Sequence, residues 1–305
     1  MKKFNLHFRA LCGMALYVSA VVTFSSCTEE VDNLSNQETR RCAPVSVHVK
    51  DFSVSMEDFP GTRSAESPAG YKYVQAMTLA FYEGATEVCK VTQLKDDHST
   101  YETFGDFTCS LPLGSYTMVV VARDSLEGDV FTLTSPTVAA YTSEKVRETF
   151  AKTQPVVVSG TAAMDLGTIT LNRVISRLGI VSTDKRPANA AKIRTTFGGG
   201  SKRFNPTTGL AADDAGFVTV SLPKAVVGES IGISNSLFLA SDEEKMDVTI
   251  EVLDANDEVL YTKVVEDVPL KRNRMTKLTG ALFNATATSV FQLETTWLPP
   301  VDLPI

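Results

Sequence analysis

One short motif in the sequence matches a pattern that carries the nucleophilic serine of many hydrolases. Residues 228–232 read G-E-S-I-G, which puts Ser230 at the nucleophile position. Such a serine needs a strand before it, a helix after it and a histidine later in the chain to accept its proton. The residues after Ser230 instead resemble a strand, and the three histidines, His7, His48 and His98, all precede it. We therefore predict that the protein is not an enzyme and has no catalytic residues.

Patterns that would bind a phosphate or a metal fail on their spacing. Residues 198–202 read G-G-G-S-K but lack the spacing of a phosphate-binding loop and the helix that follows one. The turn that begins at Asp254 starts like a calcium loop. However, Val259 stands where that loop needs glycine and Val265 where it needs glutamate. Histidine and cysteine show no zinc-ligand spacing. We expect no metal and no cofactor.

The cysteine at position 27 follows a segment typical of a secretory signal. Two lysines and an arginine precede the apolar run 10–24. That run is shorter than the about 20 residues that a membrane-spanning helix requires. Two serines then precede Cys27, as in the lipobox of bacterial lipoproteins, whose cysteine is acylated and becomes the new N-terminus. We predict a signal peptide at residues 1–26 and lipidation at Cys27; the alternative is ordinary signal cleavage nearby, with Cys27 incidental.

The composition indicates a folded protein, and the signal segment predicts that it works outside the cytoplasm. Hydrophobic residues make up 43% of the 305 residues and charged residues 21%, which is enough for full cores and argues against global disorder. The net charge of -7 argues against binding to nucleic acid. Residues 27–44 are polar and without periodicity, so they are predicted to be a flexible tether.

The other cysteines are too few for a disulfide framework. Cys12 lies in the signal region, and Cys42, Cys89 and Cys109 follow it. Cys89 and Cys109 could face each other across a hairpin centred near Ser99, and an oxidising compartment would permit a bond between them. Two independent buried thiols are the alternative.

From residue 45 onward the sequence alternates between apolar and polar residues with a period of two. This alternation predicts half-buried strands separated by turns. The predicted strands are 45–55, 77–81, 87–94, 101–109, 115–123, 165–171, 175–182, 191–197, 216–222, 230–239, 247–253, 258–266, 275–283 and 289–297. Residues 142–152 are the best helical candidate, and the small residues 159–163 suggest a linker. We predict an all-β fold of two β-sandwiches, an N-terminal domain at 45–160 and a C-terminal domain at 161–305.

Four stretches resemble a known family. Residues 268–283 resemble the V-P-x-x-R-N-x-x-T-x-L-x-G segment of Bacteroidales fimbrillin-type proteins, and 166–180 look like their L-x-R-x-[VI]-[AS]-x-[LI] segment. Residues 148–152 resemble a short acidic-Phe segment, and 111–116 an L-P-x-G-x-Y strand entry. The resemblance implies two consecutive transthyretin-like sandwiches in a lipid-anchored outer-membrane protein at the cell surface, part of a fimbria (pilus).

In that family, stalk subunits are cut after an arginine, lose their first strand, and accept a strand from the next subunit. Arg63 follows the 45–55 strand in a breaker-rich stretch and is the candidate for such a cut. A plain surface arginine is the alternative reading, and Arg40 and Arg41 are alternative targets. The resemblance implies that other fimbrial subunits are the partners, through β-strand addition.

The C-terminal residues indicate which kind of subunit this is. Pro299, Pro300 and Pro304 remove backbone donors, so the tail is a poor strand to donate to a neighbour. We predict an anchor or accessory subunit that takes part in fimbria assembly and cell adhesion. A glycan-binding surface lipoprotein on the same scaffold is the alternative. Sugars stack on exposed aromatic rings, but Trp297 is the one tryptophan and most Phe and Tyr residues fall on the buried phases of the predicted strands.

Overall fold

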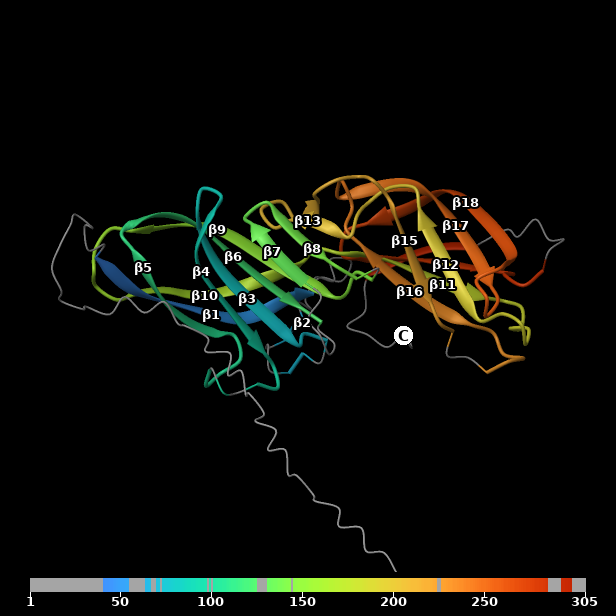
Figure 1. The fold of residues 1–305 in the computed structure, drawn as a ribbon, viewed down its shortest axis with the longest axis horizontal. Coiled ribbons are helices and arrows are strands. Elements are labelled where there is room, and N and C mark those ends of the chain that lie inside the picture. Colours follow the sequence, from blue (N-terminus) through green and yellow to red (C-terminus); the bar gives the residue numbers. More distant parts are fainter. Residues whose placement is uncertain are drawn as a thin grey trace, which may run out of the picture. The chain divides into compact units, whose positions relative to one another are not determined.

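The computed structural model describes residues 41–54, 64–66, 70–71, 73–97, 99, 101–124, 131–143, 145–223, 226–284 and 292–297. Within these ranges the chain forms twenty β-strands and no α-helix, so the predicted all-β fold is confirmed (Figure 1). The same ranges therefore contain no helix long and apolar enough to cross a membrane.

The first sheet contains eight strands and encloses the first core. Its order is β2 (Ser64–Glu66), β1 (Cys42–Val54), β10 (Met164–Arg173), β9 (Thr149–Val158), β6 (Gly114–Arg123), β3 (Ala76–Glu83) and β4 (Thr86–Leu94), and β5 (Asp106–Pro112) pairs with β1. Alternate residues of β1 point inward, so Ala43, Val45, Val47 and Val49 are buried while their neighbours are partly or fully exposed. Apolar residues of the other strands join them in one cluster.

Two four-stranded sheets make a sandwich in the second half of the chain. One has the order β16 (Gly232–Leu237), β11 (Ser176–Ser182), β19 (Arg274–Gly280) and β20 (Gln292–Trp297). The other has the order β15 (Phe217–Ser221), β12 (Lys192–Phe197), β17 (Glu243–Leu253) and β18 (Val259–Lys271). A second apolar cluster takes residues from both sheets, for example Ile180 of β11 and Ile250 of β17.

A small fourth sheet joins residues from both halves of the sequence. Its order is β14 (Leu210–Ala211), β13 (Arg203–Asn205), β8 (Val138–Tyr141) and β7 (Phe131–Ser135). A third apolar cluster packs this sheet against the outer face of β3 and β6, and it includes Phe204 and Phe238. Seven of the eight residues of β3 are buried because the first cluster covers one face and the third covers the other.

The sheet pairing places β10 on the other side of the expected domain boundary. We expected the second domain to begin at residue 161, but β10 pairs with β1 and β9 of the first sheet. The division of the chain at 160/161 into two domains, and the transthyretin-like character of each, stay predictions.

The helical candidate at 142–152 is wrong. Thr149 begins strand β9, which pairs with β6 over ten residues, and Val146 forms an isolated bridge with Ser236. The four-residue spacing of Val146 and Phe150 does not reflect a helical face, because Val146 enters the third apolar cluster and Phe150 the first. Long-range pairing thus outweighs a weak local preference for helix.

Candidate functional site

Two of the predicted site residues lie outside the described residues. These are Cys27, the predicted lipidation site, and Arg63, the predicted processing site. The other two are described: Cys89 lies on β4 and Cys109 on β5, and both are half-buried free thiols in this structure. A disulfide between them stays a prediction.

The place that strand β1 occupies between β10 and β5, over the first apolar cluster, is a candidate interaction site. We call it the seat of β1. One edge of β1 pairs in parallel with β10, from Val45 opposite Met164 onward. The other edge pairs antiparallel with β5 over seven residues and with β2 over three. Because full burial of a valine or larger apolar side chain stabilises a fold by about 1.5–3 kcal/mol, the inward-facing residues hold β1 firmly. The seat is shaped to take an extended strand with alternate apolar residues.

The last described strand is also paired within the chain. Strand β20 lies at the end of its sheet and pairs antiparallel with β19, from Arg274 opposite Trp297 to Thr279 opposite Gln292. Strand β20 is therefore paired within its own chain. The proline-rich tail that follows it lies outside the described residues.

A buried ionic network lies where the strands of the two halves meet. Glu148 precedes β9 and accepts hydrogen bonds from the Nε of Arg173 and, at 2.8 Å, from the Nη2 of Arg177. Arg173 also donates to the hydroxyl of Tyr71 at 2.9 Å and to the Oδ1 of Asn273 at 3.0 Å. The side chain of Arg173 is fully buried and that of Glu148 is 7% exposed. Five residues from five segments thus share one hydrogen-bonded charge cluster, which we call the junction network.

The charges of the junction network depend on one another. Burial would lower the pKa of Arg173, but the Glu148 carboxylate and Tyr71 outweigh it, and the pKa is raised. Burial, followed by the charge of Glu148, raises the pKa of Tyr71, so its phenol stays protonated and able to donate. Because a buried charge without its partner is strongly unfavourable, the network fixes how its segments pack rather than activating a nucleophile.

The turn between β18 and β19 has a backbone suited to the network. Asn273 adopts a left-handed conformation with φ of 59°, which asparagine tolerates better than most residues. Its backbone N–H donates to the carbonyl of Ile175 at 2.7 Å. Its neighbour Arg272 pairs with Asp242 at 2.7 Å and donates to the carbonyl of Thr208 at 2.9 Å. The turn at residues 272–273 is therefore tied to three other segments, at Asp242, Thr208 and Ile175.

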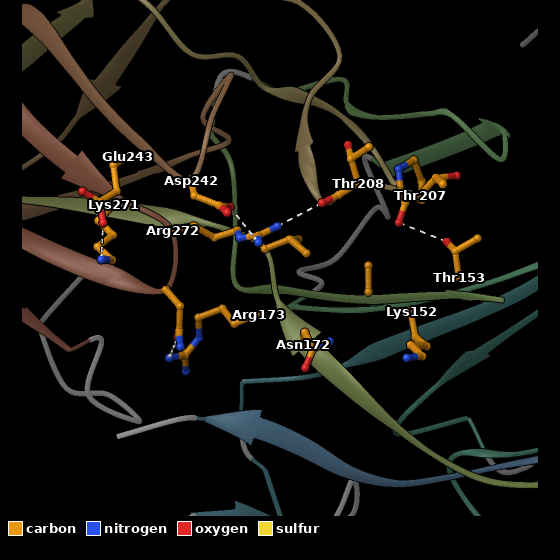
Figure 2. Close-up of a pocket in the computed structure, with 15 residues that line it drawn as sticks. Lys152, Thr153, Asn172, Arg173, Thr207, Thr208, Asp242, Glu243, Lys271 and Arg272 are labelled. Carbon is orange, nitrogen blue, oxygen red and sulfur yellow. Dashed lines mark hydrogen bonds and ion pairs between the residues drawn. The ribbon is translucent and has the colours of Figure 1, made fainter. Parts of the chain in front are cut away.

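A polar cleft of about 570 Å³ opens beside this turn. Figure 2 shows Arg272 reaching Asp242 on one side and the backbone of Thr208 on the other. Lys271 pairs with Glu243 across the same wall, and the hydroxyl of Thr153 donates to the carbonyl of Pro206 at 3.0 Å. Four charged side chains of these walls form two ion pairs, Arg272 with Asp242 and Lys271 with Glu243. Charges that neutralise each other in this way are more typical of a packing contact than of a catalytic centre.

The four stretches that carry the family resemblance have structural roles. Three of them meet at the junction network, through Glu148, Arg173 with Arg177, and Asn273. In the fourth, the hydroxyl of Tyr116 donates to the carbonyl of Pro112 at 2.8 Å. Sequence reasoning missed Tyr71, since it lies in a breaker-rich stretch without periodicity and nothing local marks it.

A comparison with protein-family models shows the family of the chain. The model of a family of unknown function, DUF6562, matches residues 44–301. The chain belongs to this family. No match was found among curated proteins.

Solved structures share the fold of this DUF6562 protein at low sequence identity. The fimbrial anchor protein Mfa2 from Porphyromonas gingivalis aligns with a TM-score of 0.52 and 11% identity, over 84% of this chain and 98% of that chain. A candidate adhesin from Bacteroides ovatus aligns with a TM-score of 0.51 and 11% identity, over 86% and 97%. A candidate polysaccharide-binding protein from Bacteroides thetaiotaomicron aligns with a TM-score of 0.48 and 11% identity, over 84% and 98%. The first two of these alignments confirm, at the level of the fold alone, the resemblance predicted from the sequence.

Proposed function

We propose that this DUF6562 protein is a cell-surface lipoprotein that serves as an anchor or accessory subunit of a fimbria, in fimbria assembly and cell adhesion. The fold that it shares with a fimbrial anchor protein supports this function. The signal segment and Cys27 support attachment to the outer membrane through a lipid. Besides the membrane, its partners are other subunits of the fimbria.

The observation that carries the proposal is that β1 fills its own place between β10 and β5. Removal of β1 would leave one open edge on β10 and another on β5, with an apolar floor between them. An open edge with pockets for alternate side chains is what β-strand addition requires. Arg63 lies in the stretch between β1 and β2, so a cut there would separate β1 from the rest of the chain. While β1 stays, the seat is filled.

The C-terminal end favours an anchor or accessory subunit over a repeated stalk subunit. Strand β20 pairs with its own β19, and three prolines follow within the last seven residues. A proline lacks the backbone N–H that a donated strand needs for its ladder. The chain is therefore suited to end a fibre or to attach one.

The N-terminus of the mature protein on cells tests this proposal. We expect acylated Cys27 on a chain that keeps β1 and that co-purifies with fimbriae. The variant Cys27→Ser should be released from the membrane fraction, whereas Cys42→Ser should remain in it. Material that begins at Ser64 would contradict the anchor assignment and show a polymerising subunit.

A glycan array on residues 44–305 tests the competing function. Selective binding to one class of glycan, without co-purifying fimbrial subunits, would overturn the fimbrial assignment. Absence of such binding together with fimbrial co-purification is the expected result.

A further inference from the structure

The first sheet has a seam between β4 and β5, its two ends. Among the described residues, β4 pairs with β3 and β5 pairs with β1, and no ladder joins β4 to β5. The side chain of Gln93 on β4 bridges the seam: it donates to the carbonyl of Asp106 at 2.6 Å and accepts from the N–H of Gly105 at 2.8 Å. In the described part of the chain, β4 and β5 are therefore neighbours that no ladder of backbone hydrogen bonds joins.

The register across the seam brings two cysteines together. β4 and β5 follow each other in the chain and run in opposite directions, so a step back along β4 matches a step forward along β5. From Gln93 beside Gly105 and Asp106, four residues back along β4 is Cys89 and three or four residues forward along β5 is Cys109. Both side chains are half-buried and pack against the same apolar cluster.

We propose that Cys89 and Cys109 form a disulfide bond that closes the seam between β4 and β5. The register that sets the thiols side by side and the hydrogen bond between them support this bond. The proposed extracytoplasmic setting, in which such bonds persist, supports it as well. Cys42, on β1 opposite Pro112, belongs to the other edge of β5 and is not part of the pair.

The two thiols differ in a way that suits oxidation by thiol–disulfide exchange. A hydrogen bond from Cys109 lowers the pKa of Cys89, and the same contact together with burial raises the pKa of Cys109. The Cys89 thiolate attacks a disulfide oxidant and releases one of its thiols. Cys109 then loses its proton and attacks the Cys89 sulfur of the mixed disulfide, releasing the second thiol. Two protein thiols become one disulfide, and one oxidant disulfide becomes two thiols.

The bond gives β5 a second attachment. The described residues pair β5 with β1 alone, so loss of β1 would leave β5 without a ladder. A bond from Cys109 to Cys89 keeps β5 next to β4 and so preserves one wall of the β1 seat. This consequence rests on the proposed strand addition, whereas the bond itself does not.

Mass mapping of the full-length protein tests the bond. The protein is incubated with oxidised glutathione, its remaining thiols are alkylated under denaturing conditions, and it is digested without reductant. We expect a cross-linked peptide that contains Cys89 and Cys109, and it should persist in Cys42→Ser. In Cys89→Ser, Cys109 should be alkylated instead. Alkylation of both cysteines in the wild-type protein, or a cross-link from either one to Cys42, would overturn the inference.

A second experiment separates the bond from the proposed function. A protease site is placed between residues 55 and 63, the oxidised protein is cut, and labelled peptide 42–54 is added in excess. Hydrogen exchange of the β5 amides is then followed in the cut protein and in its Cys89→Ser, Cys109→Ser double variant. We expect β5 to stay protected during peptide exchange in the oxidised protein and to lose protection in the double variant. Equal protection in both would overturn the role of the bond at the seat. A cross-link without any peptide exchange would support the bond and contradict strand addition.

Discussion

At the scale of single residues, the junction network holds charges whose burial is costly. One carboxylate, that of Glu148, faces two guanidinium groups, and the side chain of Arg173 has no exposed surface. Its hydrogen bonds to Tyr71 and Asn273 satisfy the donors that Glu148 does not reach. A network of this kind tolerates little change, because each removal leaves another buried group without its partner.

We predict that Glu148→Gln destabilises the protein by about 3–5 kcal/mol, the usual cost of leaving a buried charge without its partner. Urea unfolding followed by circular dichroism measures the difference. As a control, Glu243→Gln removes the ion pair with Lys271, whose side chains are 67% and 44% exposed, and should have a much smaller effect. Equal effects of the two variants would show that the network does not hold its segments together.

The cross-strand pair of Arg194 and Glu251 predicts a dependence on pH. A hydrogen bond from Arg194, at 2.6 Å, lowers the pKa of Glu251 from its ordinary 4.5. Because the folded pKa is the lower one, the pair stabilises the protein above pH 4.5, and this contribution is lost as the pH falls through the folded value. Urea unfolding of wild type and Glu251→Gln across this range should therefore give curves that converge on acidification. Parallel curves would contradict the assignment.

At the scale of elements, β1 depends on long-range pairing and on its inward face. We predict that Val47→Asn loosens β1, since it puts an amide among buried apolar groups at a cost of about 1–3 kcal/mol or more. Lys50→Asn, at an exposed position of the same strand, is the matched control. Limited proteolysis of the stretch between β1 and β2 should be faster in Val47→Asn alone. Equal rates in the two variants would mean that the inward face does not retain β1.

The sequence was sufficient to predict most long strands, although not the ten-residue β9, and among the short ones it predicted β15. The alternation in 45–55 predicted β1 within a few residues, and 191–197 predicted β12 almost to its ends. The strands β2, β7, β8, β13 and β14 were missed because two to five residues seldom display a clear period. The sequence predicted the junction network only in part. The resemblance motifs contain Glu148, Arg173 and Asn273, but in three separate stretches. Which of them would touch depended on pairings between distant strands.

At the scale of the whole molecule, the third apolar cluster joins the two halves of the sequence. Phe204 and Phe238 stack in it with their ring centres 4.4 Å apart, against residues of β3, β6 and β8. The described halves therefore share a core in addition to the one each has for itself.

We predict that Phe238→Ala costs about 3–5 kcal/mol, as large-to-small changes at buried phenylalanines do. Because Phe238 lies between the halves, the variant should also separate one thermal unfolding transition into two. Differential scanning calorimetry measures both effects. The control is Val264→Ala at a side chain that is 59% exposed. A single transition in Phe238→Ala would show that the halves are coupled elsewhere.

The parallel pairing of β1 with β10 has a consequence for the order in which the protein folds. Ser46 lies beside Asp165, 119 positions later in the chain. A ribosome therefore produces β1 and its antiparallel neighbour β5 well before β10 exists. Contacts so distant in sequence form slowly, because the intervening chain must first be ordered. Although β1 is made first, it is thus among the last strands to gain a hydrogen-bonded neighbour on both edges. During this delay a strand from another molecule can compete for its place.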